Sequence, residues 1–159
     1  MGPGENASPE ENELAYELGE VVAQQGWVLL TGGRSFGVMD AAMKGATDHN
    51  GLTIGVLPGE NLVGSSQYAQ IKILTGLGSA RNNINVLSSH VIVVLGMAAG
   101  TASEVGLAIK ANKKIIFLKQ DDLTIKFFKK LGTYRIVVTD TVKETIAQIN
   151  DFISLGQIQ

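Results

Sequence analysis

The sequence contains no cysteine, which excludes disulfides, thiolate metal sites and thiol nucleophiles together. Its two histidines, His49 and His90, lie far apart along the chain and cannot build a histidine-based metal cluster. Long apolar runs are also missing, because no stretch approaches the roughly 20 residues of a membrane span. The N-terminus has neither the basic nor the apolar region of a signal peptide. We therefore expect no metal centre, no membrane segment and a cytoplasmic location.

A strong charge imbalance is absent as well. The formal net charge is -2, and the lysines are spread along the chain except between residues 110 and 130. Nucleic-acid binding needs a continuous basic face, so we expect no nucleic-acid partner.

With 159 residues and 45% hydrophobic content, the chain is long enough for one domain covering residues 1–159. Glycine, at 19 residues, is in excess and gathers in loops, where phosphate-binding backbones need it.

The central stretch of the chain is a small-residue loop, Leu95–Glu104, between an apolar run at 91–95 and a helical pattern that begins near Thr101. A buried strand that leads straight into a helix points unpaired amides and the positive end of the helix dipole at the space above the sheet. Glu104, one turn into the helix, faces the same space. The loop is therefore a candidate anion site, and the alternative is a tight turn with a Ser/Thr cap.

Two further loops have the same character. Thr31–Gly37 follows a strand predicted at 27–30 and leads into a helix, and residues 75–83 precede another helix. The Gly-x4-Gly spacing of the first loop resembles a P-loop, but Val38 and Met39 stand where Lys and Ser/Thr would bind phosphate and magnesium, so ATP hydrolysis is not expected. Two of the three arginines, Arg34 and Arg81, lie in these loops. Their planar guanidinium groups match phosphate or carboxylate, and the alternative is that each forms a surface ion pair.

Strands and helices alternate along the whole sequence. This pattern predicts a Rossmann-like α/β fold of three layers with a mostly parallel sheet, in which the glycine-rich loops share the carboxyl edge. The predicted strands lie at 27–30, 53–57, 70–74, 91–95, 115–118 and 136–138.

The first residues, Met1–Ser8, form a Gly-x-Gly-x-x-Ala loop that has no strand ahead of it. Ser8, Pro9 and Glu11 then give a helix start with a serine cap, proline at the first helical position and glutamate three residues after the cap. A loop of this kind normally follows the central strand of a parallel sheet. We therefore expect an apolar strand ahead of Met1 in the natural protein.

The three loops taken together resemble the LOG/Smf superfamily of Rossmann-type proteins. The motifs are Thr31–Met39, Arg81–Asn82 and Gly100–Glu104, and the likeness covers most of the chain. Within the superfamily, the opening Gly-Pro-Gly-Glu and the Gly-Gly-Arg-Ser-x-Gly-Val-Met segment are most similar to the molybdenum cofactor carrier proteins of algae and cyanobacteria. The resemblance implies a carrier that binds this phosphorylated cofactor for storage or transfer, that uses no NAD, and that is not an enzyme.

The same resemblance carries an enzymatic alternative, because related phosphoribohydrolases cleave the N-glycosidic bond of nucleoside 5′-monophosphates with an Arg and a Glu that match Arg81 and Glu104. Their Pro-Gly-Gly stretch, part of the loop that cradles the ribose phosphate, is replaced here by Leu95–Ala99, so the resemblance favours the carrier over the hydrolase. The family also implies a homo-oligomer, a dimer or a tetramer, and molybdoenzymes as recipients. The candidate cofactor-binding residues are Gly2, Gly4, Gly32, Gly33, Arg34, Ser35, Arg81, Gly96, Gly100, Thr101, Ser103 and Glu104.

Overall fold

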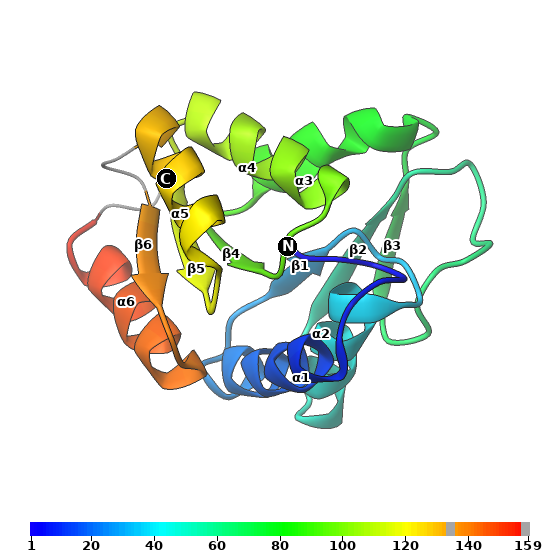
Figure 1. The fold of residues 1–159 in the computed structure, drawn as a ribbon. Coiled ribbons are helices and arrows are strands. Elements are labelled where there is room, and N and C mark those ends of the chain that lie inside the picture. Colours follow the sequence, from blue (N-terminus) through cyan, green and yellow to red (C-terminus); the bar gives the residue numbers. More distant parts are fainter. Residues whose placement is uncertain (133–135, 157–159) are drawn as a thin grey trace.

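Parallel strands alternate with helices in the computed structural model, which describes residues 1–132 and 136–156, except that a loop alone joins the second and third strands (Figure 1). The described elements confirm the predicted α/β fold. In chain order they are α1 (Pro9–Gln24), β1 (Leu29–Thr31), α2 (Gly37–Asp48), β2 (Thr53–Leu57), β3 (Ile71–Leu74), the 3-10 helix η1 (Gly78–Arg81), α3 (Asn82–Ser88), β4 (Val91–Leu95), α4 (Ala99–Lys110), β5 (Lys114–Leu118), α5 (Asp122–Gly132), β6 (Ile136–Thr139) and α6 (Val142–Ser154).

The strands form two parallel three-stranded sheets, in the orders β1-β2-β3 and β4-β5-β6. On the edge of β4 away from β5, the carbonyl oxygen of Met1 accepts from the Leu95 amide at 2.9 Å, and the Met1 amino group donates to the Val93 carbonyl. The first residues thus run along β4 and then cross to α2, where the Pro3 carbonyl accepts from the Val38 amide. The N-terminal segment lies between the two sheets (Figure 1). The apolar strand expected ahead of Met1 stays a prediction.

The core is built in two layers, one on each face of the β4-β5-β6 sheet. Ile116 and Leu118 of β5 pack with α1, α2 and α6, while Ile115 and Phe117 point to the opposite face and pack with α3, α4 and α5. This alternation follows from the two-residue period of a strand, and all four side chains are fully buried. Burial on both faces explains why β5 is an almost uninterrupted apolar run. Among the described helices, none is long and apolar enough to cross a membrane.

Local capping sets the helix boundaries. The Ser8 hydroxyl accepts from the Glu11 amide, and the Glu11 carboxylate accepts from the Ser8 amide, so the predicted capping box of α1 is confirmed. The strand predicted at 27–30 begins two residues later, because the Trp27 amide is still bonded to the Val22 carbonyl at the end of α1. Helix α5 begins at Asp122, before the repeating apolar residues that start at Ile125. The Asp121 carboxylate accepts from the amides of residues 123 and 124 and so starts the helix there.

Candidate functional site

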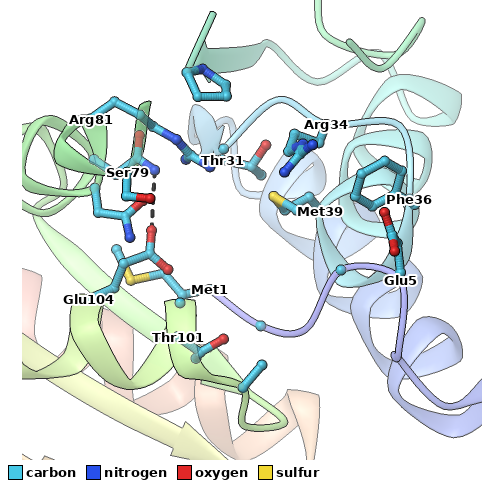
Figure 2. A pocket seen from close by; sticks show the side chains of 18 of the residues that line it. Met1, Glu5, Thr31, Arg34, Phe36, Met39, Ser79, Arg81, Thr101 and Glu104 are labelled. Atoms are coloured by element: carbon cyan, nitrogen blue, oxygen red, sulfur yellow. Dashed lines mark hydrogen bonds between the residues drawn. The ribbon is translucent and has the colours of Figure 1, made fainter. Parts of the chain in front are cut away.

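A pocket of about 480 Å³ opens at the carboxyl ends of β1 and β4 (Figure 2). Its walls come from residues 1–6, from the loop after β1, from η1 and α3, and from the first turn and a half of α4. All the glycine-rich loops selected from the sequence therefore contribute to one cavity. Its size lies within the range of small-molecule sites.

Arg81 is the buried cation of this pocket. Its side chain comes from the end of η1, the residue is 8% exposed, and its Nε and Nη1 atoms have no hydrogen-bond partner. The guanidinium lies against the backbone of Gly32, where an added Cβ would be 2.3 Å from Nη1 and 2.6 Å from Nη2. Gly32 thus leaves the space that this side chain occupies. Burial lowers the pKa of Arg81, the nearby Glu104 carboxylate raises it and the Arg34 cation lowers it.

Glu104 and Asn85 face Arg81 from two neighbouring helices. Asn85 in α3 donates from Nδ2 to Oε1 of Glu104 in α4 at 3.3 Å, and the two residues are 2% and 8% exposed. The Oδ1 atom of Asn85 has no partner, and neither has Oγ1 of Thr101, one turn before Glu104. In the described part of the chain, all but one of the buried side-chain atoms without a partner belong to Arg81, Asn85 and Thr101. Such atoms lose free energy when left unpaired, so their concentration in one cavity indicates a ligand site.

The outer end of the pocket contains an exposed cation. Arg34 lies over the ring of Phe36, with Cζ 4.9 Å from the ring centroid. Neither Arg34 nor Arg81 forms an ion pair with any residue that the structure describes. Figure 2 shows Arg81 reaching toward Thr31 and the Arg34 side of the pocket, with Thr101 and Glu104 on the α4 side. The structure therefore contradicts the alternative that Arg34 and Arg81 each form a surface ion pair.

Two helix starts border the pocket without a side-chain cap. The N-cap residues of α2 and α4 are Phe36 and Ala98, and neither contributes a capping hydrogen bond, unlike Ser8 and Thr141 at α1 and α6. Amides at such helix starts favour negatively charged or electron-rich groups. Helix α4 thus begins without the Ser/Thr cap that was the alternative for this loop, and the anion site stays a prediction.

The structure brings most of the candidate residues together and separates four of them. Gly2, Gly4, Gly32, Arg34, Arg81, Gly100, Thr101 and Glu104 line the pocket, whereas Gly33, Ser35, Gly96 and Ser103 do not.

The four residues outside the lining have local structural roles, and for Ser35 the contact is that of its backbone amide, which donates to the Gly64 carbonyl. Gly33 has a φ of +71° and abuts Gly55 of β2, while Gly96 has a φ of +69° and abuts Pro3 and Glu11. The Ser103 hydroxyl donates to the Gly100 carbonyl and accepts from Asn82.

Sequence reasoning missed several polar and aromatic lining residues. Asn85 is the most informative of them, because it follows Arg81 by four residues and so falls on the same side of the helical segment. That spacing in the sequence could have identified Asn85 as a candidate site residue. Glu5, Asn6, Phe36, Met39, Ser79 and Asn82 also line the cavity.

The fold and the pocket define a Rossmann-like α/β protein with a candidate small-molecule site at the carboxyl ends of the strands, lined by two arginines and two glutamates. The model of the SLOG cluster4 family matches residues 1–146, and the chain belongs to this family.

Two solved structures resemble almost the whole chain. The molybdenum cofactor binding protein of the phototrophic bacterium Rippkaea orientalis is 47% identical, with a TM-score of 0.94, and the match covers 96% of this chain and 94% of that one. The molybdenum cofactor carrier protein of Chlamydomonas reinhardtii is 46% identical, with a TM-score of 0.92, and the match covers 97% and 95%. A cytokinin riboside 5′-monophosphate phosphoribohydrolase of Mycobacterium marinum matches only 50 residues at 42% identity, which is 31% of this chain and 27% of the enzyme.

Proposed function

We propose that the pocket binds molybdenum cofactor for storage or transfer and leaves it chemically unchanged. The observation that carries the proposal is the set of buried, unpartnered polar atoms on Arg81, Asn85 and Thr101, in a cavity large enough for a phosphorylated pterin. The near full-length similarity to a carrier protein and to a cofactor binding protein supports it.

The residues present fit such a ligand. Arg34 and Arg81 supply positive charge, and the start of α4, which has no side-chain cap, supplies amides. Gly100 also lines the cavity, and an added Cβ there would meet no atom within 4 Å, so a ligand can approach its backbone closely. Gly2 and Gly4 line the cavity too, but a Cβ would meet the Leu95 carbonyl at Gly2 and the Phe36 ring at Gly4. A carrier needs only these binding groups, because it breaks no bond.

The phosphoribohydrolase alternative is the less favoured function. Arg81 and Glu104 do share the pocket, but Leu95–Ala99 departs from the Pro-Gly-Gly stretch of those enzymes. In addition, Oε1 of Glu104 is held by Asn85, so only the other carboxylate oxygen is available to a substrate.

The experiment that tests the proposal compares the fate of two ligands. The protein is loaded with molybdenum cofactor, freed of excess ligand and denatured, and the released pterin and phosphate are identified. In parallel, the protein is incubated with AMP and the solution is searched for free adenine and ribose 5-phosphate. We expect intact cofactor and no adenine. Adenine release that is lost in Glu104→Ala would establish the hydrolase instead.

We further propose a homo-oligomer, a dimer or a tetramer, in the cytoplasm, with molybdoenzymes as recipients of the cofactor. The exposed apolar side chains of the edge strand β3, Ile71, Ile73 and Leu74, are each more than 40% exposed and support self-association. Light scattering on the purified chain tests this directly, and a monomeric mass across micromolar concentrations would contradict it.

A further inference from the structure

We propose that the buried end of the pocket binds the 2-amino-4-oxo edge of a pterin ring, and that the phosphate of the same ligand lies at the exposed end beside Arg34. This inference rests on the proposed function and specifies how the ligand is oriented. It is drawn from the hydrogen-bonding atoms that the pocket leaves without partners.

The buried end offers both hydrogen-bond donors and hydrogen-bond acceptors. Arg81 presents the N–H groups of two unpartnered nitrogens, Nε and Nη1, whereas Asn85 presents an unpartnered carbonyl oxygen. Glu104 presents the carboxylate oxygen that Asn85 does not hold, and the Thr101 hydroxyl can donate or accept. A matching ligand group must therefore contain an acceptor for Arg81 and adjacent N–H donors for Asn85 and Glu104.

The amide edge of a pterin has this composition. Its 4-oxo oxygen accepts hydrogen bonds, and its ring N–H and 2-amino group donate them side by side. The charges of Arg81 and Glu104 cancel, which suits an uncharged ring more than an ion. Both residues are more than nine-tenths buried, so the recognition takes place where water competes little.

A phosphate fits the same end poorly. A phosphate monoester is mainly a dianion above a pH of about 6 and then presents only acceptors. It would meet the Glu104 carboxylate at close range and would leave the Asn85 carbonyl oxygen without a partner. A phosphate would therefore gain one favourable contact, to Arg81, and make two unfavourable ones, with Glu104 and Asn85.

The exposed end has the opposite character. Arg34 is a cation without an ion-pair partner among the described residues, and it precedes the start of α2 at Gly37, which has no side-chain cap. Arg34 and Arg81 line the same pocket, and Figure 2 shows the Arg81 side chain reaching toward the Arg34 side of it. A single ligand can therefore contact both ends of the pocket.

The test separates the two ends with fragments of the ligand. A phosphate-bearing, fluorescent pterin is bound to the protein and displaced with 6-hydroxymethylpterin, which has no phosphate, or with inorganic phosphate, which has no ring. GMP and AMP are added as further competitors, because guanine has the same 2-amino-oxo edge and adenine lacks it. The parent chain is compared with Glu104→Gln, Asn85→Leu and Arg34→Gln, and Glu17→Gln on the exposed surface of α1 is the control for loss of a carboxylate.

We expect Glu104→Gln and Asn85→Leu to weaken competition by 6-hydroxymethylpterin about tenfold or more and to change competition by phosphate less than twofold. Arg34→Gln should do the reverse, and Glu17→Gln should change neither. Circular dichroism identifies any variant that is unfolded, and Glu104→Gln, which keeps the shape of the side chain, decides the case if Asn85→Leu fails to fold.

Weakened phosphate competition in Glu104→Gln, or unchanged pterin competition in both variants of the buried end, would overturn the inference. Competition by GMP at the strength of the pterin, with AMP inactive, would support the edge recognition but contradict a pterin-selective carrier. If the phosphate-bearing pterin does not bind the parent chain at all, the proposed function itself fails.

Discussion

Replacing Gly32 with alanine should separate ligand binding from stability. The backbone φ of Gly32 lies outside the left-handed region, so alanine can adopt it without strain. The new methyl group, however, would lie 2.3 Å from Nη1 and 2.6 Å from Nη2 of Arg81, where an ordinary contact is about 3.4 Å or more. The guanidinium must therefore move by roughly 1 Å, and it can do so because it is the end of a flexible side chain.

The two consequences differ in size. A hydrogen bond to a charged group contributes about 1.5–3 kcal/mol, so loss of the Arg81 contact should weaken cofactor binding about 10- to 150-fold. Stability should change by less than about 1 kcal/mol, which corresponds to a shift of the thermal midpoint within about 4 °C.

Titration of Gly32→Ala and the parent with cofactor, together with thermal unfolding of each, measures both effects. Gly106→Ala is the matched control, because a Cβ there meets no atom within 4 Å and the residue lies on the exposed side of α4. Binding by Gly32→Ala within twofold of the parent would refute the reasoning that Gly32 holds Arg81 against the ligand.

Three further predictions concern the fold. Ser8→Ala removes the serine half of the α1 capping box and should lower the free energy of unfolding by about 1 kcal/mol, measured by urea denaturation. Phe117→Ala leaves a cavity beside Phe128, whose ring centroid is 5.9 Å away, and should cost about 3–5 kcal/mol in the same assay. Hydrogen bonds from Lys44 and Tyr16 hold the pKa of Asp48 below its ordinary 3.8. The stabilisation is present above pH 3.8 and is lost as the pH falls through the lowered pKa. Asp48→Asn should therefore lower the urea midpoint at neutral pH and have a smaller effect near pH 2.

The sequence predicts the architecture well where local chemistry determines it. Strand Val91–Leu95 and the Ser8 cap are found where predicted, because a β-branched run and a capping box are local signals. The start of β1 at Leu29, by contrast, is not determined by the local sequence. The end of α1 takes up the Trp27 amide, and the partner of the Leu29 amide is the carbonyl of Leu52, far along the chain.

The residues of the candidate site likewise fall into those that the sequence predicts and those that only tertiary contacts reveal. Arg34 and Arg81 could be selected by residue type and by their place in glycine-rich loops, and both line the pocket. Gly33 and Gly96 have the same appearance in sequence, but their positive φ values serve turns outside the lining. The role of Asn85 depends on the orientation of α3 against α4, and packing between helices sets that orientation. Residue type therefore identifies the loops, and tertiary contacts decide which of their atoms face the ligand.

The measurement that tests the central claim most directly is equilibrium dialysis of the chain against molybdenum cofactor and, separately, against molybdate, with bound molybdenum and phosphorus quantified. The pocket described here should bind the cofactor with molybdenum and phosphorus in equal amounts and bind molybdate far more weakly, because molybdate offers no partner for Asn85 or Glu104. Equal binding of both, or of neither, would contradict the claim that this pocket carries the cofactor.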